Sequence, residues 1–449
     1  MLAACLLAAV LAAPPDDRDD ALEIGRLFLE RRDYDGAILF LEPLVEREPA
    51  ERELQFLLGM AFFAAERYAE ARRPFEACTR ADPDDSLPWE FLGRVEFRLG
   101  RLGVAVDCLE RAAAIDPREG RTWNHLGAVL SRMDRREEAR VAFRRSLGLD
   151  PSFATAHFNL GVLSALDGDS LAGIFHLREA ARLDPADDEP TEALGDLHLR
   201  LGDREAALEW YAESARRAPR DAAHRIAIGE VHEVLGRPLA AELALLRACE
   251  LAPGDPSPPV RLAAFLARRA RVRAAMDAYR RALAIDERSL AAHKGLADLA
   301  EDAGDDGLAR THIERILELG FVHPELLRRL CLLCERQGDP AGARAAFRRL
   351  ILESDGDHAS LRAIAEVMAT SGVAGIQDVP RGRDLAAALV ERTEERSAAA
   401  LFVLSRAEEA AGDPTAAAVT LERAAELFHA QEPEAVLLRR LSEQARAGR

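Results

Sequence analysis

Residues of four kinds recur every 34 positions along most of this 449-residue chain. Proline occupies one of these positions in seven consecutive units: Pro49, Pro83, Pro117, Pro151, Pro185, Pro219 and Pro253. Glycine occupies a second: Gly25, Gly59, Gly93, Gly127, Gly161, Gly195 and Gly229. A small residue and, four residues later, a large apolar residue occupy the other two, as at Ala105 and Leu109. Such a period is typical of stacked repeats, because one short unit cannot bury its apolar face without neighbours.

Each period contains two stretches in which apolar residues follow helical spacing, for example 89–99 and 102–115. Gly93 on the first stretch and Ala105 on the second leave room for two helix backbones to approach closely. Pro117 cannot continue the second helix and therefore ends the unit. We expect an all-α protein built from helix-turn-helix pairs.

The pattern resembles the tetratricopeptide repeat (TPR), in which a Trp–Leu–Gly stretch, a small residue, an aromatic residue, Ala and Pro recur over 34 residues. Two of the closest-matching units run from Trp89, Leu92 and Gly93 to Pro117, and from Trp123 to Pro151. The register holds over residues 18–357, which is ten units of 34. The resemblance implies a right-handed superhelical solenoid of about twelve TPR-like repeats in all.

Changes in this register suggest the domain organisation. We expect a signal-peptide-like segment at 1–17, seven regular repeats at 18–255 and three divergent repeats at 256–357. An irregular repeat with an insertion follows at 358–397, then a TPR-like repeat at 398–431 and a capping helix at 432–449.

The N-terminal segment carries an unbroken apolar run at residues 2–13, followed by Pro14 and Pro15. Twelve apolar residues are too few to cross a bilayer as a helix, which needs about 20, but they suit a secretory signal. The run lacks the usual basic residues before it, and Cys5 with its neighbours resembles a lipobox. The segment favours export, to a bacterial periplasm or envelope; the alternative is an Ala-rich capping helix on a cytoplasmic protein.

The chain has 78 acidic and 60 basic residues and a formal net charge of −18, which argues against broad nucleic-acid or anionic-membrane binding. No phosphate-binding loop, nucleophile elbow or zinc-protease motif occurs in the sequence. The sequence therefore predicts neither an enzyme nor a cofactor or metal site.

Cys331 and Cys334 form the one Cys-x-x-Cys sequence. Cys331 stands at the close-packing glycine position, and Cys334 follows one helical turn later, so both suit a buried core. A redox or metal role for this pair is the alternative.

In the TPR family, the first helices of successive pairs line a concave groove that binds partners. Carried over position by position, the resemblance implies the following groove residues: Phe56, Met60, Phe63, Glu90, Arg94, Phe97, Asn124, Phe158, Val162 and Leu166. Some of these apolar side chains could instead pack against the next repeat. Further along the chain the lining becomes acidic, as at Asp298 and Glu301.

A large apolar strip on a groove usually marks an interaction site for a helix or an extended peptide. The sequence therefore predicts a non-enzymatic scaffold that binds a protein or peptide in its groove, by family analogy in envelope assembly, secretion or export. A cytoplasmic TPR adaptor or regulator is the alternative.

Overall fold

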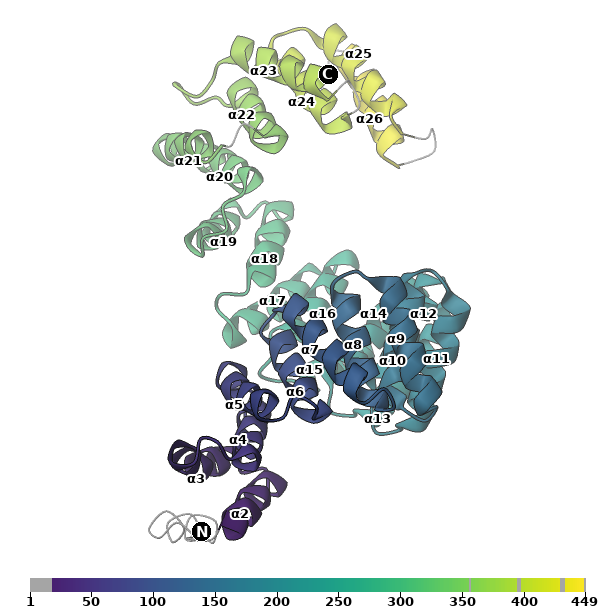
Figure 1. Cartoon of the computed structure of the whole chain (residues 1–449). Coiled ribbons are helices and arrows are strands. Elements are labelled where there is room, and N and C mark those ends of the chain that lie inside the picture. The colour runs from purple at the N-terminus through teal and green to yellow at the C-terminus, as the bar shows by residue number, and fades with distance from the viewer. Residues whose placement is uncertain (1–17, 355–356, 394–396, 429–432, 448–449) are drawn as a thin grey trace. The chain divides into compact units, whose positions relative to one another are not determined.

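A computed structural model describes residues 18–354, 357–393, 397–428 and 433–447, and within these residues the only regular elements are helices. They run in twelve consecutive pairs, from α2/α3 to α24/α25, followed by α26 (Figure 1). The expected all-α solenoid of paired helices is confirmed. The predicted signal segment, 1–17, lies outside the described residues. The chain divides into an N-terminal unit, Met1–Arg220, and a C-terminal unit, Asp221–Arg449.

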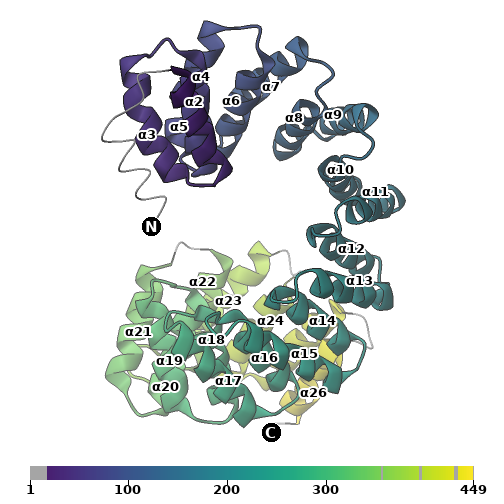
Figure 2. The same ribbon diagram turned by 90° about the horizontal axis from the view of Figure 1, so that it is seen from below.

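The N-terminal unit contains six pairs, and pairs that follow one another in sequence pack side by side, as the run from α8/α9 to α12/α13 shows (Figure 2). Its helices are α2 (Arg18–Glu30), α3 (Tyr34–Arg47), α4 (Arg52–Ala64), α5 (Tyr68–Ala81), α6 (Ser86–Arg98), α7 (Leu102–Ile115), α8 (Gly120–Arg132), α9 (Arg136–Leu149), α10 (Ala154–Leu166), α11 (Ser170–Leu183), α12 (Glu189–Arg200) and α13 (Arg204–Arg217).

The C-terminal unit contains six further pairs and α26. Its helices are α14 (Ala222–Val234), α15 (Pro238–Leu251), α16 (Ser257–Arg268), α17 (Val272–Ile285), α18 (Leu290–Asp302), α19 (Asp306–Glu318), α20 (Pro324–Arg336), α21 (Pro340–Leu352), α22 (His358–Thr370), α23 (Val379–Arg392), α24 (Ala398–Ala410), α25 (Pro414–Glu426) and α26 (Pro433–Arg446). Residues 371–378, between α22 and α23, form the long connection in the segment where the sequence predicts an insertion.

The glycine position of the repeat is where the two helices of a pair come closest. A Cβ atom on Gly127 would lie 2.6 Å from the Phe143 ring, and one on Gly93 would lie 2.6 Å from Leu109. Real Cβ contacts are not this short, so a side chain here would push the large apolar residue of the second helix aside. The fixed spacing of 16 residues between these partners is what the periodic sequence encodes.

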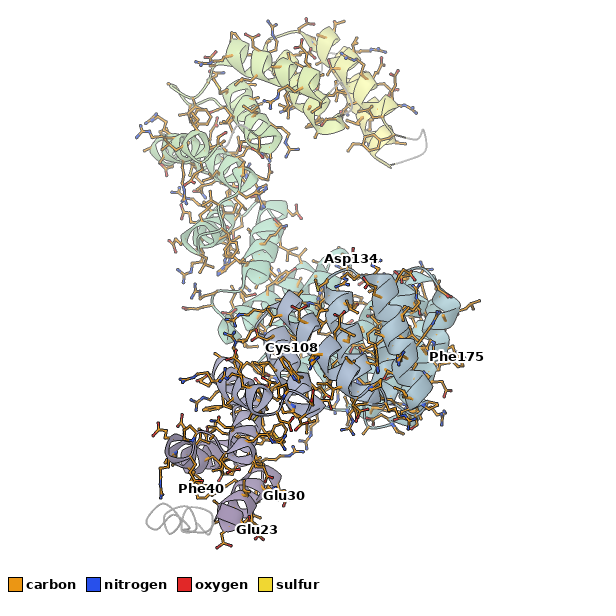
Figure 3. The ribbon with its side chains drawn as sticks, viewed as in Figure 1. Glu23, Glu30, Phe40, Cys108, Asp134 and Phe175 are labelled. Carbon is orange, nitrogen blue, oxygen red and sulfur yellow. The ribbon has the colours of Figure 1, made fainter. Side chains whose placement is uncertain are left out.

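The turn between the two helices of each pair contains a residue whose backbone adopts the left-handed conformation, with positive φ. Glycine supplies it in most repeats, as at Gly100, where φ is +77°. Four turns use other residues instead: Arg32, Glu66, Asp134 and Ala270, with φ between +56° and +60°. Asp134 is labelled at such a turn between α8 and α9 (Figure 3). A Cβ makes this conformation unfavourable, so these four turns carry backbone strain.

A side-chain N–H ties the start of each of several pairs to the turn before it. Nε1 of Trp89 donates to the carbonyl oxygen of Pro83, and Nε1 of Trp123 to that of Pro117, both at 3.1 Å. His157 stands at the same repeat position, and its Nε2 lies 3.1 Å from the Pro151 oxygen. A carbonyl oxygen only accepts, so Nε2 of His157 carries the proton and replaces the indole N–H.

In a divergent repeat, the large apolar residue of the second helix packs differently from its equivalents in the regular repeats. Tyr211 lies against Gly195 of its own pair, whereas the equivalent positions two repeats later hold Tyr279 and Ala263, both buried. The Tyr279 ring lies instead where a Cβ of Gly295, on the next pair, would be. The packing of this repeat is thus completed by its neighbour.

Candidate protein-interaction groove

A groove of about 460 Å³ lies between the first helices of three successive pairs, α2, α4 and α6. Phe56 and Met60 of α4 contribute to its apolar wall, together with Leu29 of α2 and Leu87 of α6. Leu87 is 45% exposed, so apolar surface is open to solvent here. Charged side chains stand at the same groove and pair among themselves: Arg26 with Glu53, and Arg52 with Asp82 and Asp85.

The aromatic side chains beside this groove belong partly to the packing between repeats. Phe56 contacts the rings of Phe75 and Phe91 edge-on, with centroids 5.7 and 5.6 Å away. Phe63 contacts Tyr68 and Phe91 in the same manner, at 5.5 and 5.8 Å. Both phenylalanines are half-buried, so each has one side in the core and one side available to a ligand.

Arg94 and Arg98 of α6 lie over these rings. The guanidinium carbon of Arg94 is 4.6 Å from the Phe63 centroid and 4.7 Å from the Phe91 centroid. Arg98 stacks 5.1 Å from the Tyr68 centroid and donates from Nε and Nη2 to the Tyr68 hydroxyl, at 3.0 and 2.8 Å. Stacking of this kind fixes a guanidinium in place while leaving its N–H groups available for acceptors.

Glu90 and Asn124 are placed differently from the sequence expectation, because both side chains are buried, at 5% and 3% exposure. Thr122 Oγ1 donates to a Glu90 carboxylate oxygen at 2.8 Å, and Asn159 Nδ2 donates to Asn124 Oδ1 at 2.9 Å. Burial raises the pKa of Glu90. These two residues connect the first helices of neighbouring pairs below the surface rather than facing a partner.

Two further groups of α8 stand near the arginines of α6. His125 has its Nε2 3.6 Å from a Glu90 oxygen, and its pKa is lowered to about 4 by burial and by the charges of Arg94 and Arg121. Burial also lowers the pKa of Arg94; the charge of Glu90 raises it, and the charges of Arg121 and Arg98 lower it. The three guanidinium groups therefore lie near enough to act on one another.

A second groove, of about 490 Å³, lies between α10 and α12 and brings together Val162, Leu166, Leu199 and Arg200. Leu166 is 57% exposed there. Phe158 packs on the nearby cluster of Leu177, Leu194 and Leu197, and Phe97 on the core of α7 to α10. Of the ten predicted groove residues, four line the two open grooves, Phe63 and Arg94 form part of the aromatic cluster, Glu90 and Asn124 are buried, and Phe97 and Phe158 are half-buried against the core.

The resemblance also assigns Leu87, at the second position of its repeat, to the groove, and Leu87 supplies exposed apolar surface there. Sequence reasoning missed Phe91 and Tyr68, which lie beside the groove and hold the two arginines in place. The sequence carries no signal for Phe91, because the resemblance does not assign its repeat position to the groove.

Cys331 and Cys334 are free thiols with 0% and 1% exposure. Burial raises the pKa of Cys331 to about 12 and also raises that of Cys334. Cys331 Sγ donates to the carbonyl oxygen of Ala343 at 3.5 Å, across its pair. Protonated, buried thiols are poor nucleophiles and poor metal ligands, so this placement favours a packing role.

The fold and the grooves define a helical-repeat protein with open apolar surface on the first helices of its pairs. The family model described as Tetratricopeptide repeat matches residues 22–86, 56–120, 126–188 and 192–256, about half of the chain. The protein belongs to the tetratricopeptide repeat family. No curated protein matches the sequence.

Solved structures of TPR proteins resemble parts of the chain. A tetratricopeptide repeat protein from Parabacteroides merdae ATCC 43184 is 15% identical over 55% of this chain and 98% of its own, with a TM-score of 0.44. PilW, described as a widely conserved type IV pilus biogenesis factor, is 20% identical over 45% of this chain and 94% of its own, with a TM-score of 0.42. YrrB, described as a TPR protein with an unusual peptide-binding site, is 21% identical over 40% of this chain and 92% of its own, with a TM-score of 0.33.

Proposed function

We propose that this protein is a scaffold that binds a peptide segment of a partner protein in the groove between α2, α4 and α6. The family membership supports a protein-interaction role. The observation that carries the proposal is the open groove of about 460 Å³, with Phe56, Met60 and the exposed Leu87 on its apolar wall. An open apolar surface of this kind is more than a solvated helix requires, and it suits the apolar side of a bound segment.

Selection of binding peptides tests the proposal. A random peptide library displayed on phage is selected on the immobilised full chain, and binding of labelled selected peptides is measured by fluorescence anisotropy. The variant Met60→Glu/Leu87→Glu places two carboxylates in the apolar groove, and we expect it to weaken binding at least tenfold, because apolar ligand groups would then have to desolvate them.

Val104→Glu is the matched control, since Val104 is 46% exposed on α7, a second helix of the same unit that does not line the groove. Circular dichroism verifies that both variants remain folded. Selected peptides that bind both variants as well as the original chain would place the binding surface elsewhere, and a failure to select any peptide would contradict peptide binding.

We further propose that the scaffold acts outside the cytoplasm, in envelope assembly, secretion or export. The support is the apolar run at residues 2–13 and the two prolines after it. In the part of the chain that the structure describes, no helix has the length and apolar character that crossing a bilayer requires. N-terminal sequencing of the native protein, with cell fractionation, tests the proposal; a mature chain that retains residues 1–17 in the cytoplasmic fraction would support the adaptor alternative.

A further inference from the structure

We propose that the segment bound in this groove is acidic and amphipathic, with apolar side chains against Phe56 and Met60 and carboxylates on Arg94, Arg98 and Arg121. This inference rests on the proposed function and adds the chemistry of the ligand.

The first step is the local excess of positive charge. Arg94, Arg98 and Arg121 come from α6 and α8, and the charges of Arg98 and Arg121 act on Arg94. Among the described residues, these three arginines form one ion pair, that of Arg94 with Glu90 at 3.8 Å, and Glu90 is buried and engaged by Thr122. Glu119 and Asp150 also lie near enough for their charges to act here, but neither forms an ion pair with these three guanidinium groups.

The second step is that these guanidinium groups have unused donors. Among the described residues, neither Arg98 nor Arg121 forms an ion pair through its side chain; Arg98 instead donates to the Tyr68 hydroxyl. The guanidinium carbon of Arg94 lies 4.6 and 4.7 Å from the centroids of the Phe63 and Phe91 rings. A guanidinium fixed by stacking keeps its N–H groups directed outward, in the fork that a carboxylate fits.

The third step is that this cationic cluster adjoins the apolar groove. The Phe91 ring lies under Arg94 and also contacts Phe56, which lines the groove. By contrast, both arginines at the groove itself are paired with carboxylates, as Arg52 is with Asp85 at 2.7 Å, and Glu30 of α2 adds a further carboxylate at the opposite edge. An incoming ligand therefore meets apolar surface in the groove and, on the α6 side, guanidinium groups without a surface ion pair, which favour carboxylates over ammonium groups at that side.

The experiment uses the peptides selected on the full chain. We expect acidic residues to be enriched over basic ones beside the apolar residues, and affinity to fall as salt is raised. The variant Arg94→Gln/Arg98→Gln/Arg121→Gln should bind these peptides at least tenfold more weakly, with little remaining salt dependence. Replacing Asp and Glu of a selected peptide by Asn and Gln should have the same effect on the original chain.

Arg136→Gln/Arg140→Gln is the matched control, because both arginines lie on α9, the second helix of its pair, and each already pairs with Asp167. Neutral or basic selected peptides that depend on Met60 and Leu87 would overturn this inference and leave the proposed function standing. Acidic peptides that bind the arginine variant unchanged would also overturn it. Failure to obtain any bound peptide would contradict both.

Discussion

Two arginine sites, one in each unit, have different roles on the same type of helix. On α20 of the C-terminal unit, Arg329 donates to Asp298 and Glu301 of α18 at 2.8 and 2.9 Å, and its side chain is 14% exposed. Its neighbour Arg328 reaches Glu366 of α22 at 2.8 Å. On α6 of the N-terminal unit, Arg98 bonds to a tyrosine hydroxyl and to no carboxylate of the described chain.

The difference shows how one repeat architecture supports two uses of a cation. Where the preceding and following pairs supply carboxylates, an arginine fastens successive pairs together. Where aromatic rings hold the guanidinium and carboxylates are missing, the same residue type remains available to a ligand. The comparison predicts that arginines of the first kind affect stability and those of the second kind affect binding.

The largest effect is expected for Arg329→Leu, which leaves Asp298 and Glu301 without their cation. Hydrogen bonds to charged groups contribute more than neutral ones, and the partly exposed acids reduce the loss. We expect the free energy of unfolding of the C-terminal unit to fall by roughly 1–2 kcal/mol. Urea unfolding followed by circular dichroism measures it, and an unchanged transition would contradict a fastening role.

The pH dependence of stability should distinguish two carboxylates, Glu325 and Glu90, because their pKa values are shifted in opposite directions. Burial opposes ionisation of Glu325, but the hydrogen bond and charge of Arg328, with the charges of Arg362 and Arg329, lower its pKa below the ordinary value. Its stabilising contribution is therefore present above the ordinary pKa and is lost as pH falls through the lowered one. We expect Glu325→Gln to be less stable than the original chain at pH 7, with the difference disappearing in acid.

Glu90→Gln should change the stability at pH 7 in the opposite direction from Glu325→Gln. Burial raises the pKa of Glu90, so its ionised form costs stability above that raised pKa, and the cost is relieved as pH falls through it. The amide oxygen of Gln can still accept the hydrogen bond from Thr122. Thermal unfolding at pH 7 and pH 4 measures both variants, and equal shifts of the same sign would show that the two carboxylates have similar surroundings.

A smaller effect is expected at a helix-connecting turn of the C-terminal unit. Ala270 has φ of +56°, whereas the equivalent Gly100 of the N-terminal unit adopts φ of +77° without a Cβ. Ala270→Gly relieves about 1–2 kcal/mol of left-handed strain and adds about 0.5–1 kcal/mol of backbone entropy cost, so the net gain in stability is about 0–1.5 kcal/mol. Urea unfolding checks it; a loss of stability would show that Ala270 is not strained.

The smallest effect on stability is expected for Arg98→Gln, within about 0.5 kcal/mol, because the side chain lies at the surface and pairs with no carboxylate. Urea unfolding measures the free energy of unfolding of Arg98→Gln and of Arg329→Leu under the same conditions. A loss as large as that of Arg329→Leu would remove the distinction between the two arginines.

The sequence predicts the repeat architecture well because its determinants are local and periodic. Gly127 and Phe143, 16 residues apart, pack as their spacing implies, and Pro117 follows the end of α7. The groove is harder to predict, since a repeat position identifies a face of a helix but not the depth of a side chain. Glu90 and Asn124 lie on the predicted helices, yet Thr122 and Asn159 of the following pairs draw them into the interior.

The packing of Tyr279 restricts how this sequence can change over evolutionary time. Its ring occupies the space that a side chain at position 295 would need, so a replacement of Gly295 requires the ring to move or residue 279 to become smaller. The residue that is acceptable in one repeat therefore depends on the residue present in its neighbour.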